Sequence, residues 1–148
     1  MDGREAAQWE AARGGEPEEL MRLADLVGCD GLRERAGRVD LRTTAVAAMR
    51  YCEDFSELPW LGRLAMEGND ADARAALDTI VDQSSRPRRS TDPEDADDLH
   101  SGCETLLALA RDVARPRDRR VLAIRSLRML SERGCVKRGD IPGDLDAR

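Results

Sequence analysis

Apolar residues recur at three- and four-residue spacing along most of this 148-residue chain, which is the pattern of amphipathic helices. Proline or a capping residue stands before the main apolar runs, and glycine or a polar turn follows them. The pattern predicts three helix pairs, covering residues 18–53, 56–83 and 93–133. Short connections make neighbouring helices antiparallel. We therefore expect an all-α fold.

The three predicted pairs form one repeat domain over residues 16–134, with a shorter segment at each end. Residues 1–15 are expected to be an amphipathic or frayed lead-in, in which Trp9 packs over the open end of the first pair. Residues 135–148 are expected to be an extended tail. Residues 84–92 are polar, contain proline and lack a pattern, so they predict a linker inside the domain.

A short pattern, Asp-x-Arg-x-x-(Ala/Leu), stands near the start of the second helix of each pair. Its copies begin 32 and then 46 residues apart, and internal repeats of about 20–50 residues are typical of helical solenoids. An aspartate at a helix start accepts from exposed N–H groups. Each arginine is expected to pair with the aspartate of the adjacent copy. The predicted structural ladder consists of Asp40, Arg42, Asp72, Arg74, Asp118 and Arg120.

The motif and its helix pairs resemble the HEAT-repeat family, in particular the short HEAT-like repeats first named for phycobilisome lyases. The resemblance covers about residues 18–133 and implies a right-handed, armadillo-like α-solenoid whose second helices line a concave binding face. Most such proteins are adaptors or scaffolds, so it implies no chemistry. Two positions depart from the pattern: Leu77 stands where the other copies have alanine, and Ser126 is a polar residue at a core-like position.

The outward positions of the second helices are the predicted binding surface for another protein, which would dock a helix or a peptide segment there. The candidate partner-binding residues are Arg50, Tyr51, Thr79, Asp82, Arg125 and Arg128. Two alternatives stay open: these positions form an ordinary solvated face, or Tyr51 packs at a junction between repeats.

Charge is unevenly distributed along the second half of the chain. Residues 111–138 contain ten basic and three acidic residues, whereas residues 92–104 contain six acidic residues and no lysine or arginine. The basic stretch supports an alternative function, a helical-repeat protein that binds nucleic acid. The formal net charge of −6 and the lack of aromatic residues in this stretch favour instead its neutralisation by the neighbouring acidic helix.

Composition and motifs disfavour several other classes of protein. Alanine, leucine, arginine and glutamate dominate, and Lys137 is the one lysine, a bias typical of a GC-rich, bacterial-like coding genome. The sole histidine, His100, is expected to pack at the edge of an apolar stripe. No glycine-rich phosphate loop, nucleophile elbow or paired-carboxylate motif is present. We therefore expect a protein that is not an enzyme, with no catalytic residue and no cofactor.

The four cysteines, Cys29, Cys52, Cys103 and Cys135, are separated by gaps of 23, 51 and 32. Without a Cys-x-x-Cys pair they predict no metal site, and Cys103 is expected to be a small core residue. No secretory signal and no apolar run of membrane-spanning length are found. These features predict a soluble, cytoplasmic protein with reduced cysteines and no membrane partner.

Overall fold

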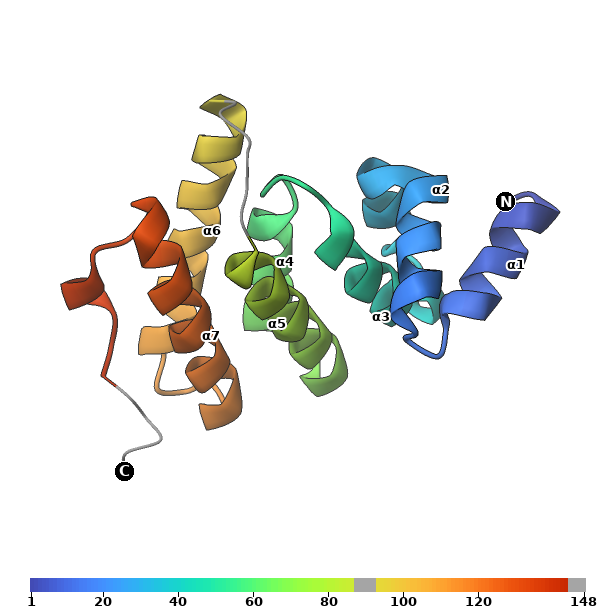
Figure 1. Cartoon of the computed structure of the whole chain (residues 1–148). Coiled ribbons are helices and arrows are strands. Elements are labelled where there is room, and N and C mark those ends of the chain that lie inside the picture. The colour runs from blue at the N-terminus through green and yellow to red at the C-terminus, as the bar shows by residue number, and fades with distance from the viewer. Residues whose placement is uncertain (87–92, 144–148) are drawn as a thin grey trace. The chain divides into compact units, whose positions relative to one another are not determined.

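The computed structural model describes residues 1–86 and 93–143, and all regular elements within these ranges are helical (Figure 1). None of the described helices is long and apolar enough to cross a membrane. The chain divides into two compact units, Met1–Cys52 (unit 1) and Glu53–Arg148 (unit 2). The elements are α1 (Gly3–Ala12), α2 (Pro17–Arg35), α3 (Val39–Ala48), η1 (Met49–Tyr51), α4 (Leu58–Glu67), α5 (Asp70–Ser85), α6 (Pro93–Arg111), α7 (Arg117–Leu130), η2 (Ser131–Arg133) and η3 (Arg138–Asp140), where η denotes a 3-10 helix.

Unit 1 contains α1, α2, α3 and η1, with α2 packed against both α1 and α3. The lead-in segment is a regular helix, because the Asp2 carboxylate accepts a hydrogen bond from the backbone N–H of Glu5 and caps α1. Trp9 on this helix is buried, with 4% of its surface exposed. The apolar core of the unit is Trp9, Ala12, Leu20, Leu23, Ala24, Leu32, Ala36, Ala45, Val46, Ala48, Met49 and Cys52.

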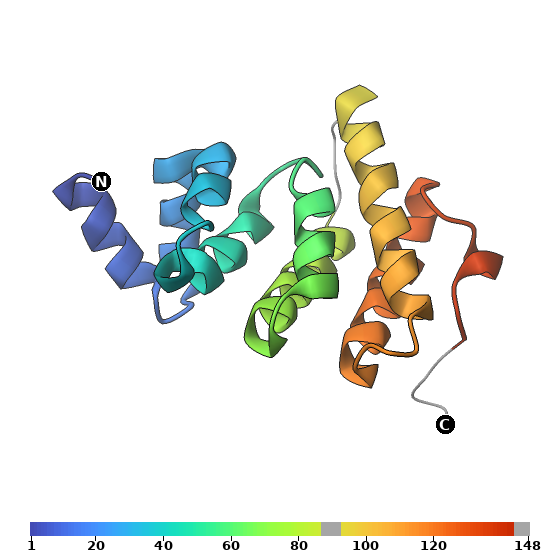
Figure 2. The same cartoon turned by 180° about the vertical axis from the view of Figure 1, so that it is seen from behind.

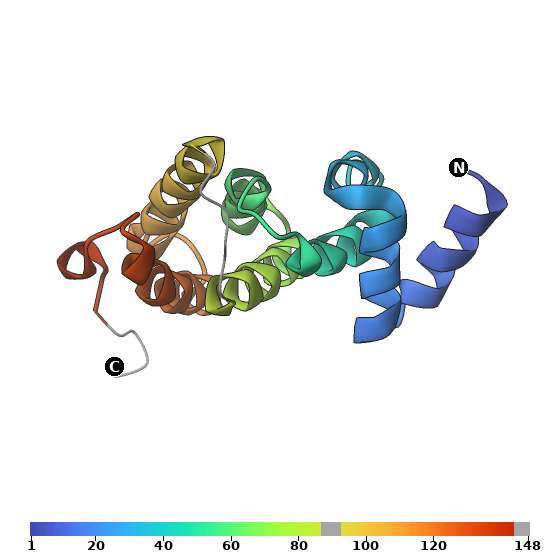
Figure 3. The same cartoon turned by 45° about the horizontal axis from the view of Figure 1, so that its top comes forward.

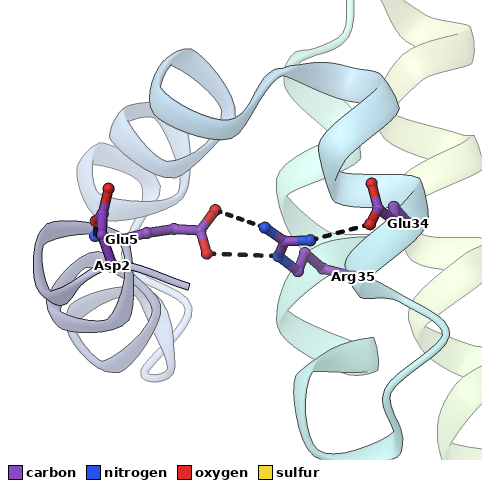
Figure 4. Close-up of polar contacts among 4 residues, drawn as sticks. All are labelled: Asp2, Glu5, Glu34 and Arg35. Atoms are coloured by element: carbon purple, nitrogen blue, oxygen red, sulfur yellow. Dashed lines mark hydrogen bonds and ion pairs between the residues drawn. The ribbon is translucent and has the colours of Figure 1, made fainter.

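An ion pair joins the two N-terminal helices of unit 1 (Figure 4). Two guanidinium nitrogens of Arg35 face the two carboxylate oxygens of Glu5, at 3.2 and 3.4 Å, and a third lies 3.3 Å from Glu34. The hydrogen bond and charge of Glu5, followed by the charge of Glu34, raise the pKa of Arg35. Because both carboxylate oxygens of Glu5 are bound, the pair restricts the orientation of α1 against α2.

Gly28 breaks the regular course of α2. Its backbone has φ 77° and ψ 160°, a conformation that side chains with a Cβ adopt rarely, and two helical segments meet there. The apolar spacing before Gly28 predicts the first segment, and α2 continues beyond the glycine to Arg35.

Unit 2 consists of two helix hairpins, α4–α5 and α6–α7, packed as two layers. Figures 1 and 3 show α4 beside α6 in one layer and α5 beside α7 in the other, and Figure 2 shows the α4–α6 side. The closest approach involves two glycines: a Cβ on Gly102 would meet the side chain of Leu58, and one on Gly62 would meet Thr105. Without side chains at these two positions, the backbones of α4 and α6 can pack closely.

The helix bounds fit the apolar pattern closely. The expected pairs correspond to α2–α3, α4–α5 and α6–α7. Helix α5 continues to Ser85, so the expected linker starts later than residue 84, and residues 87–92 lie outside the described residues. The tail contains the short helix η3 as far as it is described.

The cysteines form two disulfides, Cys29–Cys52 and Cys103–Cys135, so the expectation of reduced cysteines is wrong in this structure. Each bridge joins the first helix of a pair to the segment that follows the 3-10 turn ending its second helix. The Cα atoms are 6.0 and 6.2 Å apart, within the range of natural disulfides. Sequence gaps of 23 and 32 give no indication of this proximity, because it arises only when the helices fold back.

Candidate functional site

The motif arginines of the first and third copies bind backbone carbonyls at the end of the preceding helix. Nε of Arg42 donates to the carbonyl of Ala36 at 2.9 Å, next to the end of α2. Nε of Arg120 donates to the carbonyl of Ala110 at 3.1 Å, in the last turn of α6. The last four carbonyls of a helix have no partner within it, so these arginines supply the missing donors.

The predicted Asp–Arg ladder is not formed between the second and third copies. The guanidinium of Arg74 pairs with Asp78, four residues later on the same helix, at 3.1 Å. The carboxylate of Asp118 accepts from the backbone N–H of Arg119 at 3.0 Å. In the first copy, Asp40 pairs with Arg38 at 3.1 Å. At these two helix starts, Asp40 and Asp118 thus find a local partner within two residues.

Arg119, the residue beside the motif arginine, holds the end of α4. Only 8% of its surface is exposed, and it donates to the carbonyls of Ala65 and Met66, each at 3.4 Å. Its other terminal nitrogen lies 2.9 Å from the carboxylate of Asp70, at the start of α5. Sequence reasoning missed this residue, although the doubled arginine in the third copy of the motif sets that copy apart.

The structure separates the predicted partner-binding residues into buried and exposed ones. Thr79 is fully buried, so the prediction that it faces a partner is wrong; it lies on the same side of α5 as Ala76, Ile80 and Gln83, which are also fully buried. Asp82 is half-buried and pairs with Arg86 at 2.8 Å.

Arg50 and Tyr51 belong to η1 of unit 1 and are half-buried. Nε of Arg50 donates to the carbonyl of Ala47 at 2.8 Å, so part of its hydrogen-bonding capacity is used at the end of α3. These two residues therefore belong to a different compact unit from Arg125 and Arg128.

Arg117, Arg125 and Arg128 form an exposed row along α7, which we call the α7 arginine stripe. Their spacing of eight and three residues places them on one side of a helix, over about 16 Å along its axis. None of the three forms an ion pair with a described residue. No ion pair joins these three arginines to a described acidic residue of α6, the helix that the sequence predicts to neutralise the basic stretch.

His100 lies on the exposed side of α6, so the expectation that it packs beside the apolar stripe is wrong. Its Nε2 is 3.1 Å from a carboxylate oxygen of Glu104, and both side chains are largely exposed. This pair occupies consecutive turns of one helix. Among the described residues, no three histidine, cysteine or acidic side chains are gathered as metal ligands would be.

A hollow of about 440 Å³ opens where α5 and α7 end, and we call it the α5–α7 hollow. Arg133 is held beside it in two ways: its guanidinium lies 5.2 Å from the centre of the Phe55 ring, and it donates to the carbonyl of Arg86. Sequence reasoning did not find this hollow, because its two sides lie more than 40 residues apart. Its lining residues are Ser84, Ser85, Arg86, Met129, Glu132 and Arg133.

Unit 1 has a second hollow of about 380 Å³, lined by Arg4, Gln8, Arg22, Asp25 and Leu26. Glu19 binds two of these side chains: Nε2 of Gln8 donates to its carboxylate at 3.0 Å, and Arg22 pairs with it at 2.7 Å. Two of the five lining side chains, Gln8 and Arg22, are thus engaged with a neighbouring carboxylate.

Comparison with known proteins gives no assignment: no protein-family model, no curated protein and no solved structure matches the chain.

Proposed function

We propose that this chain is a non-enzymatic interaction scaffold of the HEAT-like repeat type, which binds another protein on the α5–α7 layer of unit 2. The single observation that carries the proposal is the α7 arginine stripe, a row of exposed cations with no ion-pair partner in the described part of the chain, on the same helix that flanks the α5–α7 hollow. Neighbouring cations on one helix face repel each other, whereas an oppositely charged partner turns the same charges into attraction.

The stacking of the two hairpins in unit 2 supports the repeat assignment. In a helical solenoid, first helices pack on first helices and second helices on second helices. Helices α4 and α6 pack together, as do α5 and α7. Arg42 and Arg120, which occupy the same motif position, also make the same kind of contact with the end of the preceding helix. The proposed architecture is a right-handed α-solenoid built from three such pairs.

Nucleic-acid binding is the second candidate function, and the same unpaired arginines favour it. Proteins that bind single strands usually combine cations with exposed aromatic rings on which bases stack. In unit 2, Phe55 is buried, and Trp60 lies on α4 in the other layer. The net charge of −6 also opposes general attraction to a polyanion. Protein binding is therefore the preferred function.

The cytoplasmic location expected from the sequence is a further proposal, and the two disulfides weigh against it. Disulfides persist in oxidising compartments and are rare in reducing ones. A count of free thiols in rapidly quenched, freshly isolated protein decides the question. Four free thiols support the cytoplasm, whereas none supports an oxidising compartment.

Site-specific photo-crosslinking tests the proposed function. A benzoylphenylalanine at position 121 lies between Arg117 and Arg125, and the control position Ala108 is exposed on α6. In cells that make the protein, we expect protease-sensitive adducts from position 121 that are missing from position 108. Adducts that disappear on nuclease treatment, or equal labelling at both positions, would contradict the proposal.

A further inference from the structure

We propose that the partner segment recognised by unit 2 is acidic: it lies along the α7 arginine stripe and seats one carboxylate side chain in the α5–α7 hollow. This inference rests on the proposed function, because it names the chemistry of the partner that the α5–α7 layer binds. Three features of unit 2 support it: the charges on α5 and α7, the fixed position of Arg133, and the composition of the hollow.

The two helices of the α5–α7 layer differ in how far their charged side chains are paired. Three acidic residues of α5 have arginine partners: Asp78 pairs with Arg74 at 3.1 Å, Asp82 with Arg86 just after the helix at 2.8 Å, and Asp70 with Arg119 of α7 at 2.9 Å. On α7, the three arginines of the stripe have no carboxylate partner among the described residues. An approaching protein therefore meets ion-paired charges on α5 and a surplus of exposed positive charge on α7, which a segment rich in aspartate or glutamate complements.

Arg133 is positioned before any partner arrives. The Phe55 ring beneath its guanidinium and the carbonyl of Arg86 both restrict the side chain. A restricted arginine loses less conformational freedom on binding than a free one, and its planar fork suits a carboxylate. The contacts to Phe55 and Arg86 leave further N–H donors of this guanidinium for a ligand.

The hollow is suited to one side chain of a peptide. Its volume of about 440 Å³ is that of a small binding pocket, and Met129 adds apolar surface for the stem of a glutamate. The hydroxyls of Ser84 and Ser85 already donate to backbone carbonyls of their own helix, so the N–H donors for a carboxylate in the hollow are the remaining ones of Arg133. Glu132 is the one acidic lining residue, and it disfavours a densely charged polyanion more than a single carboxylate.

Peptide binding to the full-length, disulfide-bonded protein tests this inference. The probe is a fluorescein-labelled peptide of repeated Glu-Ser-Leu-Glu units, and fluorescence anisotropy at low and moderate salt measures its affinity. The double variant R125E/R128E reverses two charges of the stripe. Its matched control, R63E/R138E, makes the same change in net charge at exposed positions elsewhere in unit 2.

We expect R125E/R128E to weaken binding of the peptide by about tenfold, since two attractive pairs become repulsive, and R63E/R138E to change it by less than about threefold. A third variant, Ser85→Phe, fills the hollow without changing any charge, and Ser85 is exposed in the free protein. We expect this variant to weaken the peptide severalfold.

Four results would overturn the inference. They are no binding at low salt, equal losses in the two charge variants, unchanged affinity in Ser85→Phe, and tighter binding of labelled oligothymidine or duplex DNA than of the peptide. Displacement of the peptide by unlabelled copies of the chain would point to self-association and would also overturn it. If crosslinking at position 121 still captures a protein, the proposed scaffold function stands and only the acidic character of the partner is wrong.

Discussion

Replacing Arg119 by alanine should destabilise unit 2 more than replacing any arginine of the exposed stripe. The substitution removes the donors to the carbonyls of Ala65 and Met66, which end α4, and the ion pair with Asp70. Ala65 is fully buried, so a lost donor is not easily replaced by water.

The size of the effect follows from these contacts. The two carbonyls share one nitrogen at 3.4 Å, so together they count as about one hydrogen bond to a charged donor, worth about 1.5–3 kcal/mol. The Asp70 carboxylate is 95% exposed, and such a pair adds at most about 1 kcal/mol. With the lost packing of the arginine stem, Arg119→Ala should lower the free energy of unfolding by about 2–4 kcal/mol.

Urea unfolding with the disulfides intact measures this change. The chain has two tryptophans, Trp9 in unit 1 and Trp60 in unit 2, so fluorescence of a Trp9→Phe background reports on unit 2. The matched control, Arg117→Ala, removes an exposed arginine from the same helix turn and should change stability by less than about 0.5 kcal/mol. Arg119→Lys should recover only part of the loss, because an ammonium lacks the planar fork.

The reasoning fails if Arg119→Ala is no more destabilising than Arg117→Ala. It also fails if Arg119→Lys is as stable as the wild-type chain, because a single ammonium charge would then be sufficient and the planar geometry of the guanidinium would not contribute to stability.

Three further predictions concern other parts of the chain. Ser126 is fully buried on α7, and its hydroxyl has no hydrogen-bond partner among the described residues. Ser126→Ala should therefore raise the free energy of unfolding by about 1 kcal/mol in the same urea assay. A loss of stability would contradict this prediction. Replacing Cys103 and Cys135 by alanine should lower the free energy of unfolding by about 3.7 kcal/mol, because the disulfide closes a 32-residue loop and so constrains the unfolded chain. Equal stability with and without the disulfide would refute this explanation. Glu5→Gln should speed tryptic cleavage after Arg13 relative to Asp30→Asn, since Glu5 binds Arg35 on α2, whereas Asp30 is an exposed carboxylate elsewhere in unit 1; equal rates would mean that the Glu5–Arg35 pair does not hold α1 in place.

The helical elements were predictable because apolar spacing is a local signal. Leu77, at the Ala/Leu position of the repeat motif, is fully buried, as are Ile80 and Leu127 farther along their helices. Ser126, the polar residue at a core-like position of the repeat, is buried as well. Its place in the repeat therefore predicted its burial better than the polarity of its side chain did.

The contacts of the polar side chains were much less predictable, because they depend on distance in space. Arg74 found its partner Asp78 on its own helix, where the repeat pattern predicted a partner in the next copy. The two disulfides and the α5–α7 hollow join residues more than 20 positions apart, and each arises only when the helices pack. Thr79 faces the core because its neighbours Ala76 and Ile80 set the buried side of α5.

Arginine has two distinct roles in unit 2, and the sequence pattern alone does not separate them. Arg119 and Arg120 direct their guanidinium groups at carbonyls in the last turns of α4 and α6, so their charges are used inside the fold. Arg125 and Arg128, a few residues later on the same helix, are exposed and make no ion pair with a described residue. Since an arginine bound to a helix end is needed for stability, its loss should reduce folding and binding together. The exposed arginines can be reversed in charge without that cost, and so a variant such as R125E/R128E can separate recognition of a partner from the integrity of the fold.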